Sequence, residues 1–347
     1  MRVDGFDFEL PPELIAQTAV ERGASRLLLL DRATSAVAHG SIRDLPQRLR
    51  AGDLLVANDT RVFPARLLGH RVPSGGAVEC LLLEKESAPN WSALVHPGQK
   101  LKPGAVIRFE HERGVLMAEV LERQFFGRRR IRLWAESGDD VDALVDAMGH
   151  VPLPPYIHRD DTPDDRERYQ TIFATHRGSV AAPTAGLHFD PPLLDALEAA
   201  GVARTTVTLH VGYGTFKPVR VENVEDHVVD PEPYEISDAA ARAINTALDE
   251  GRRVIAVGTT TTRALEHAAL RGDGRLLAGA ARADTFIHPG FQFRVISGLL
   301  TNFHLPKSSL LILVSAFAGR ERVLDAYREA VAHRYRFYSY GDAMLIL

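Results

Sequence analysis

One segment, residues 65–135, constrains the fold more than any other part of the chain. Short β-rich runs follow one another there, separated by Gly, Pro, Asn or Ser, and no helical pattern intervenes. Strands at this density with glycine-containing turns are typical of an antiparallel barrel or sandwich. Because about six strands are too few for two well-covered sheets, we predict a barrel.

On either side of this segment, helical and extended patterns alternate. Residues 205–211, 254–257 and 344–347 predict strands, and a helical repeat of apolar residues follows Ser237. The apolar run 310–317 predicts either a buried strand or a piece of apolar core. Alternation of this kind is typical of an α/β domain with a largely parallel sheet.

The chain of 347 residues exceeds the roughly 250–300 residues at which one hydrophobic core stops growing. The proline-rich stretch 151–157 (VPLPPYI) suits a return crossing between domains. We therefore predict a discontinuous α/β large domain (residues 1–62 and 151–347) with an inserted small antiparallel β-barrel domain (63–150).

Composition excludes several classes of protein. Cys80 is the only cysteine, which excludes an internal disulfide and cysteine-cluster metal sites and fits a reducing cytosol. We find no signal peptide and no membrane span, so we expect a cytoplasmic protein that does not enter a membrane. The net charge of −4 argues against a generic nucleic-acid coat, so RNA binding would need a local basic surface.

The common nucleotide motifs are absent. The chain has no G-x-x-x-x-G-K-[ST] phosphate loop, no G-x-G-x-x-G after a strand and no G-x-S-x-G. The absence of these motifs argues against the common nucleotide-binding folds, and also against the usual S-adenosylmethionine methyltransferase fold.

Two loops combine small residues with polar side chains: residues 178–189 (GSVAAPTAGLHF) and 208–216 (TLHVGYGTF). Small residues allow backbone amides to approach a ligand closely. In the predicted strand 205–211, Thr208 and His210 share one face. A tight structural loop and a core histidine with satisfied hydrogen bonds are the alternatives.

Residues 258–262 (GTTTT) join a strand to a helix and suit a phosphate or carboxylate, with plain N-capping as the alternative. Residues 301–304 (TNFH) add a further histidine. The spacing of His188, His210 and His304 matches no zinc signature, so we expect no metal site.

The basic feature lies in the β-rich insert. Residues 123–132 (RQFFGRRRIR) carry five arginines, no acid and two phenylalanines. In a strand, Arg128, Arg130 and Arg132 line one face, a pattern that suits phosphates and unpaired bases. A solvated barrel face is the alternative.

Together these segments resemble the S-adenosylmethionine:tRNA ribosyltransferase-isomerase family of queuosine synthesis. The resemblance covers nearly the whole chain and rests on the two loops above and on seven further segments: 6–10 (FDFEL), 52–66 (GDLLVANDTRVFPAR), 152–157 (PLPPYI), 168–174 (RYQTIFA), 258–266 (GTTTTRALE), 300–319 (LTNFHLPKSSLLILVSAFAG) and 335–346 (YRFYSYGDAMLI). One departure follows His227, where the family often carries Met-His-x-Glu. This chain has Asp230 in place of that histidine.

The resemblance implies the reaction. S-adenosylmethionine is a co-substrate that donates its ribosyl group to 7-aminomethyl-7-deazaguanine at the wobble position of tRNA, and epoxyqueuosine, adenine and methionine result. We expect no metal, no obligate protein partner and a monomer.

The implied chemistry assigns roles to the loops. The sulfonium acidifies a ribose carbon, so a base must remove a proton, and His188 or His210 is the candidate. Adenine leaves more easily when protonated, which suits Asp59 or the other histidine as an acid. The expected catalytic residues are His188, His210 and Asp59. The expected cofactor-binding residues are Ser179, Thr184, Gly186, Phe189, Tyr213, Gly214, Thr215, Thr260 and Arg263. The expected RNA-binding residues are Arg61, Arg66, Arg128, Arg129, Arg130, Lys217 and Lys307.

Two rival functions stay open at this point. One is a different S-adenosylmethionine-dependent RNA-modifying enzyme, which would release S-adenosylhomocysteine instead of adenine and methionine. The other is a non-catalytic RNA-binding protein that uses the barrel as its binding module.

Overall fold

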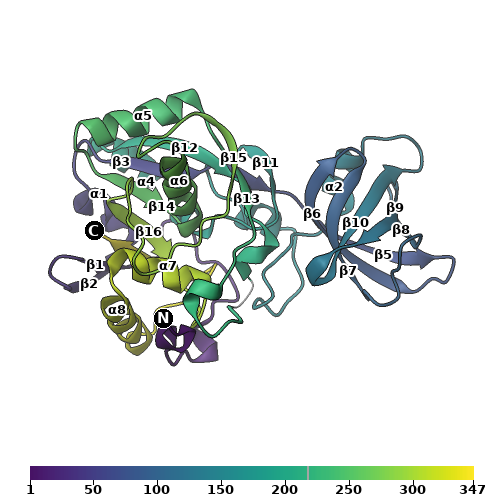
Figure 1. Cartoon of the computed structure of the whole chain (residues 1–347), viewed down its shortest axis with the longest axis horizontal. Coiled ribbons are helices and arrows are strands. Elements are labelled where there is room, and N and C mark those ends of the chain that lie inside the picture. The colour runs from purple at the N-terminus through teal and green to yellow at the C-terminus, as the bar shows by residue number, and fades with distance from the viewer. Residues whose placement is uncertain (217–218) are drawn as a thin grey trace.

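The structure, a computed structural model, describes residues 1–216 and 219–347. Figure 1 shows a large α/β domain that contains both termini and a small barrel that extends from one side of it. This is the predicted architecture of a discontinuous α/β domain with an inserted barrel. The boundaries at 62/63 and 150/151 stay a prediction.

Among the described residues, nine strands form the sheet of the large domain, in the order β15-β13-β12-β3-β14-β16-β17-β1-β2. Their bounds are β1 (Arg26–Leu30), β2 (Val37–Ser41), β3 (Leu54–Asn58), β12 (Ala203–Leu209), β13 (Glu232–Ile236), β14 (Val254–Val257), β15 (Gly279–Ala283), β16 (Gly298–Asn302) and β17 (Ala343–Ile346). The central strands β12, β3, β14 and β16 pair in parallel, as does β17 with β1. The other four neighbouring pairs are antiparallel, so the sheet is mixed and the predicted parallel pairing holds at its centre.

Helices cover both faces of this sheet. One core contains apolar residues of α5, α6, α7 and α8, and a second core on the opposite face contains those of α1 and α4. Alternate residues of β3 belong to the two cores, since Val56 packs in the first and Leu55 in the second. The helices are α1 (Leu45–Arg48), α2 (Val141–Met148), α3 (Asp165–Arg168), α4 (Pro191–Ala199), α5 (Asp238–Asp249), α6 (Thr259–Arg271), α7 (Ser309–Ala318) and α8 (Arg320–Ala332). No helix of the described chain is both long and apolar enough to span a membrane.

Two sequence-based assignments are corrected. The apolar run 310–317 belongs to helix α7 and not to a strand, and it begins where Ser308 accepts a hydrogen bond from the amide of Leu311. The run is apolar on nearly every side because α7 is buried, and such a run does not reveal its period. The strand predicted over 205–211 is β12, which ends at Leu209, so His210 follows the strand.

Six strands form the closed antiparallel barrel, in the order β10-β7-β6-β5-β8-β9. They are β5 (Arg66–Val72), β6 (Ala77–Ser87), β7 (Asn90–His96), β8 (Val106–His111), β9 (Gly114–Arg123) and β10 (Arg128–Ala135). Helix α2 packs against the barrel and contributes Leu144 and Val145 to its core. Where the two domains meet, β4 (Thr60–Val62) and β11 (His176–Ser179) pair in parallel.

Short 3-10 helices complete the described chain. They are η1 (Val3–Phe6), η2 (Pro12–Leu14), η3 (Ile42–Asp44), η4 (Phe125–Gly127), η5 (Thr184–His188), η6 (Tyr213–Phe216) and η7 (Val224–Asp226).

Neighbouring leucines on β5 provide a test of the barrel. Leu67 is buried in the barrel core, whereas Leu68 is 48% exposed. Leu67→Ala should lower the free energy of unfolding by about 2–5 kcal/mol, because it leaves a cavity. Leu68→Ala should change it by less than about 0.5 kcal/mol. Urea unfolding measures both, and equal losses for the two variants would contradict the barrel register.

Candidate active site

The carboxyl ends of the parallel strands meet at one edge of the sheet. β3, β12, β14 and β16 all end there, and Asp59, His210, Gly258 and Phe303 are the residues that follow them. In open α/β sheets, ligands bind in the crevice outside this edge. The loops identified from the sequence therefore gather where a ligand site is expected.

Asn58, the last residue of β3, fixes the geometry of this edge. Its side-chain carbonyl accepts hydrogen bonds from the amides of Thr60 (3.0 Å) and Leu209 (3.1 Å), and its amide donates to the carbonyl of Leu209 (2.9 Å). The side chain is buried. It therefore ties the end of β3 to the end of β12 and sets His210 beside Thr60.

His210 is held in a defined orientation. Its Nδ1 lies 2.7 Å from Oγ1 of Thr60, which in turn is 3.4 Å from the carbonyl of His176. If the threonine hydroxyl donates to that carbonyl, Nδ1 of His210 carries the proton and Nε2 keeps its lone pair. A Cβ at Gly178 would lie 2.6 Å from the imidazole ring, so this position requires glycine. Burial, with a smaller effect of His176, lowers the pKa of His210.

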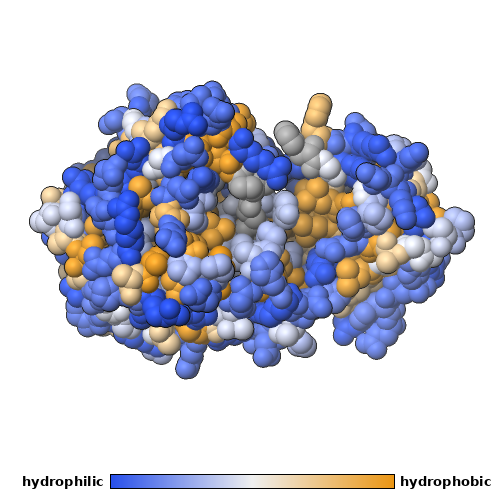
Figure 2. All heavy atoms as spheres, turned by 90° about the horizontal axis from the view of Figure 1, so that it is seen from below, coloured by the Kyte–Doolittle hydropathy of each residue, from blue (hydrophilic) through white to orange (hydrophobic). Residues whose placement is uncertain are grey.

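His210 lines a cavity of about 530 Å³ between the two domains. From the large domain this cavity is also lined by Gly178, by the loop 211–214 and by residues 230–233, and from the barrel by Trp91, Ser92 and Arg128. Figure 2 shows a group of hydrophobic side chains on the side of the barrel that is turned toward the large domain. The volume is within the usual range of small-molecule sites.

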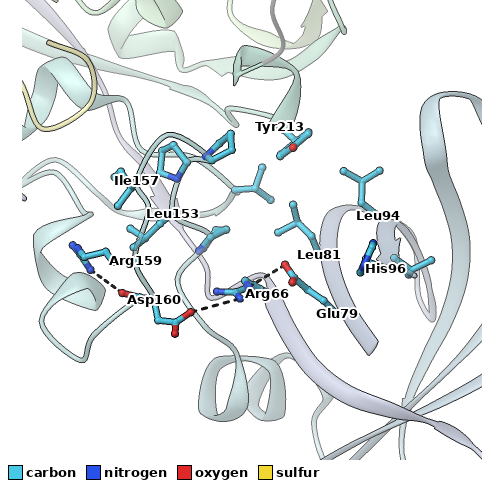
Figure 3. A pocket seen from close by; sticks show the side chains of 15 residues that line it. Arg66, Glu79, Leu81, Leu94, His96, Leu153, Ile157, Arg159, Asp160 and Tyr213 are labelled. Carbon is cyan, nitrogen blue, oxygen red and sulfur yellow. Dashed lines mark hydrogen bonds and ion pairs between the residues drawn. The ribbon is translucent and has the colours of Figure 1, made fainter. Parts of the chain in front are cut away.

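Tyr213 also borders a second interdomain cavity, of about 370 Å³. Figure 3 shows its apolar wall, which includes Leu81 and Leu94 of the barrel, and Arg66 between Glu79 and Asp160. Arg66 lies 3.0 Å from Glu79 and 4.0 Å from Asp160. The two cavities, together called the interdomain cleft, meet at Tyr213.

Deeper in the large domain lie two small cavities, of about 40 and 20 Å³, which we call the threonine-lined cavities. Thr215, Thr259 and Thr260 line both, and Thr184 and His304 line the larger one. Oγ1 of Thr260 is buried and has no hydrogen-bond partner among the described residues. It lies in the first turn of α6, where backbone amides point outward and favour negative charge.

Arg263 organises the loop 212–215 and is not free. Its guanidinium forms a buried ion pair with Oε2 of Glu232. The other oxygen of Glu232 accepts hydrogen bonds from the amide of Gly212 (2.8 Å) and the hydroxyl of Thr215 (3.0 Å). Burial lowers the pKa of Arg263 to about 10, so the side chain stays charged at neutral pH.

Ser179 is a structural link. Its hydroxyl accepts a hydrogen bond from the amide of Val211 (2.6 Å) and donates to the carbonyl of Ala181 (2.9 Å). The residue is fully buried. Its hydrogen bonds join the loop 178–189 to the loop 208–216, and it lies outside the cavities described above.

His188, near the end of the loop 178–189, is buried. Its Nδ1 lies 2.7 Å from the hydroxyl of Ser25, and its Nε2 has no partner among the described residues. Burial lowers its pKa to about 4. It lines none of the cavities described here, which separates it from His210.

Two further residues expected at the cofactor lie in packed surroundings. Phe189 is fully buried in the core beneath α4, edge-to-face with Phe173 at 5.4 Å. A Cβ at Gly186 would lie 2.8 Å from Thr171, so this glycine allows close packing of two loops. Both residues support the packing of the loops and do not border the cavities of the site.

Asp59 lies close to His210 and is 8% exposed. Its Oδ1 accepts a hydrogen bond from Thr208 at 2.6 Å, and its Oδ2 lies 3.9 Å from Nε2 of His176. The negative charge of Asp59 favours the protonated form of His210.

The arginines of β10 lie on both of its faces. Arg128 reaches across the cleft to Asp230 (2.7 Å), and Arg130 lies 3.6 Å from Glu122. Arg129 points to the other face, where it is buried and its guanidinium donates to carbonyls such as that of Gly98. A Cβ at Gly214 would lie 2.5 Å from Asp230, so Asp230 packs closely on this glycine while its carboxylate pairs with Arg128 of the barrel.

Three other expected RNA contacts differ in their surroundings. Arg61 is exposed on β4. The ammonium group of Lys307 lies between Asp7 (2.9 Å) and Asp4 (3.2 Å). Lys217 lies outside the described residues.

The three histidines do not converge on a metal. His188 bonds to Ser25, His210 to Thr60, and His304 to Thr301. Within the described parts of the chain, these histidines form no group of possible metal ligands.

Several residues of the site were not identified from the sequence. They are Asn58, Thr60, His176, Glu232 and Tyr338. Tyr338 lines the larger threonine-lined cavity with φ at 74°, a conformation that non-glycine residues rarely adopt. Such strain clusters at functional sites, but the sequence carries no signal for it.

Comparison with known proteins identifies the family. The profile described as "Queuosine biosynthesis protein" matches residues 3–346. The chain belongs to this family. Relatives named S-adenosylmethionine:tRNA ribosyltransferase-isomerase are 52% identical in Heliobacterium modesticaldum and 50% identical in Moorella thermoacetica, each over 100% of both chains. A crystal structure of S-adenosylmethionine tRNA ribosyltransferase from Thermotoga maritima is 38% identical, with a TM-score of 0.54 and coverage of 99% of this chain and 100% of that one.

Family membership supports the interpretation of the loops as a site. The match extends across both domains and includes the loops at the carboxyl edge of the sheet. The structure places His210, Tyr213, Gly214 and Arg128 around one cavity. It places Thr184, Thr215 and Thr260 around the larger of the threonine-lined cavities.

Buried histidines predict how stability depends on pH. Burial lowers the pKa of His188 to about 4 and that of His304 to about 3, whereas an exposed imidazole titrates near about 6.5. Below pH 6.5 the unfolded chain binds protons that the folded chain does not, so the free energy of unfolding should fall as the pH falls toward 4.

Urea unfolding across this range tests the effect. His188→Gln should reduce the slope, and His158→Gln, which removes an exposed imidazole, should not. An unchanged slope in His188→Gln would contradict the buried neutral state of His188.

Proposed function

We propose that this protein transfers and isomerises the ribosyl group of S-adenosylmethionine onto 7-aminomethyl-7-deazaguanine at the wobble position of tRNA. The products are epoxyqueuosine in the tRNA, adenine and methionine. The full-length similarity to proteins named for this activity carries the proposal. The large cavity beside His210 adds a physical reason, because it offers room for a nucleoside next to a neutral base.

His210 is the base in this proposal. It borders the large cavity, its orientation is fixed by Thr60, and its lowered pKa keeps the imidazole neutral at neutral pH. It accepts a proton from the ribose carbon that the sulfonium acidifies. Asp59 stabilises the imidazolium that results. The same imidazolium is then an acid that can protonate the departing adenine.

His188 has a positioning role instead. Its hydrogen bond to Ser25 and its complete burial anchor the end of η5, whose first residues Thr184 and Ala185 line the larger threonine-lined cavity. Ser179 and Arg263 also hold loops in place. Tyr213 and Trp91 provide aromatic faces in the cavity, and such faces attract a sulfonium cation.

The interdomain cleft is the proposed tRNA site. Arg128 and Arg130 on the barrel, with Arg61 and Arg66 near the junction, provide the cations for the phosphates. Arg128 must exchange Asp230 for a phosphate, which is a cost that specific binding must offset. Arg129 and Lys307 are not among the proposed phosphate contacts, because Arg129 is buried and the ammonium group of Lys307 lies between two carboxylates.

S-adenosylmethionine and tRNA are the partners of the proposed reaction. We further propose that the reaction needs no metal, that the protein acts as a monomer in the cytoplasm, and that it needs no protein partner.

Replacing the base tests the proposed function. His210→Ala should lower the rate of adenine release with precursor tRNA by about 10²–10⁴-fold, because general-base catalysis contributes that much. His188→Gln should reduce the rate less. Single-turnover assays that detect adenine, methionine and S-adenosylhomocysteine make the measurement. A near-wild-type rate in His210→Ala would refute the base assignment, and S-adenosylhomocysteine as product would indicate a methyltransferase.

A second experiment tests the RNA surface. The double variant Arg128→Gln/Arg130→Gln should bind tRNA more weakly and lower the slope of log K against log salt by about one per lost phosphate contact. Arg113→Gln is the matched control, because Arg113 precedes β9 at the opposite end of the barrel from Arg128. Unchanged affinity and slope in the double variant would exclude this face as a contact.

A further inference from the structure

A cluster of possible metal ligands lies away from the cleft. His39 on β2 faces Glu329 and His333 at the end of α8. Figure 1 shows β2 and α8 on the side of the large domain that is remote from the barrel. The reaction proposed above does not use these residues.

The three side chains are close enough to share one ion. One potential ligand atom of each lies within 4.8 Å of the other two. Nε2 of His39 is 2.9 Å from Oε1 of Glu329, and the two imidazole rings have centroids 4.4 Å apart. Glu329 lies in the last turn of α8, and His333, four positions later, is the residue that ends the helix, so the two side chains lie on the same side of it.

Hydrogen bonds outside the cluster fix which nitrogens are available. The hydroxyl of Tyr335 donates to the carbonyl of Leu27 (3.3 Å), so it accepts from Nδ1 of His39 (2.8 Å). Nδ1 of His333 donates to the backbone carbonyl of Glu329 (3.0 Å). Both Nδ1 atoms therefore carry protons, and the Nε2 atoms are the nitrogens left to bind an ion; in the structure Nε2 of His39 makes a hydrogen bond to Glu329 that an ion would replace. This arrangement is the usual outer shell of metal-binding histidines.

The contact between His39 and Glu329 needs a positive charge. A lone pair on Nε2 would face a carboxylate oxygen at 2.9 Å, which is repulsive unless a proton or a metal ion lies between them. The nearby cation Arg26 does not supply it, because its guanidinium is paired with Asp342 (2.9 Å) and packs on the ring of Tyr335.

We propose that His39, Glu329 and His333 bind a divalent transition metal ion of the zinc class. Two imidazoles and one carboxylate suit Zn²⁺ and its neighbours, and they do not suit Mg²⁺ or Ca²⁺, which prefer oxygen ligands. All three side chains are partly exposed, so water can complete the coordination. The ion would tie the edge strand β2 to the end of α8. The site therefore stabilises the large domain and takes no part in the chemistry of the cleft.

The test is a titration of the full-length protein, first freed of metal by a chelator, with Zn²⁺ near neutral pH. Competition with a chromogenic indicator gives the affinity, and Co²⁺ absorption reports the ligand set. The wild-type protein should bind one equivalent at this site, and its Tm should rise on addition of Zn²⁺ because the ion binds the folded state. His39→Ala, Glu329→Gln and His333→Gln should each weaken this binding by at least about tenfold.

Two further variants separate the site from other sources of zinc binding. Tyr335→Phe keeps the ring but removes the hydroxyl that orients His39, so it should weaken binding by about tenfold. His158→Ala removes an exposed histidine elsewhere and should change nothing. Circular dichroism checks that each variant is folded. The proposal is overturned if the wild-type protein binds no Zn²⁺, or if folded His39→Ala and His333→Gln bind it as tightly as the wild type.

Discussion

The buried side chain of Asn58 is the interaction on which the site depends. Parallel strands have no hairpin to hold their carboxyl ends together, so the ends of β3 and β12 need another link. Asn58 provides it through three hydrogen bonds to the backbone of Thr60 and Leu209. The residues next to this link in the chain are Asp59 and Thr60 after β3 and His210 after β12. The orientation of His210 is thus set by the sheet.

Interdomain contacts place the barrel over this edge. The pairing of β4 with β11 links the outgoing chain to the returning one, and ion pairs add to it across the cleft. Arg128 pairs with Asp230, and Arg282 on β15 pairs with Glu84 on the barrel (2.6 Å). The first pair is half-buried and the second is exposed, and pairs this open to solvent contribute little stability, about 0–1 kcal/mol each. They therefore orient the barrel but do not fix it rigidly, which is compatible with the proposed binding of tRNA in the cleft.

Much of the fold could be predicted from the sequence, because it is encoded in local patterns. The density of short strands in residues 65–135 predicted the barrel, and alternating helices and strands predicted the α/β domain. Helix α7 was missed as a helix because burial makes it apolar on nearly all sides, which hides its period. The antiparallel edges of the sheet depend on long-range pairing that no local pattern reveals.

The site could be located from its loops, but the roles within it could not. Gly178 and His210 belong to different loops, and nothing in either loop indicates that one makes room for the ring of the other. From the sequence, Arg263 was expected to bind the cofactor. The structure instead pairs it with Glu232, which is 31 residues earlier in the chain. His188 and His210 look equivalent in the sequence, and only burial separates them, since one is enclosed and the other borders the cleft.

The central claim is that the ribosyl group reacts beside His210, in the cleft between the domains. A crystal structure with S-adenosylmethionine and an anticodon stem-loop tests this most directly. We predict that the ribose carbon next to the sulfonium lies within reach of Nε2 of His210, with a carbon-to-nitrogen distance of roughly 3–3.5 Å in a reactive arrangement. A ribose placed beside His188 or outside the cleft would contradict the account.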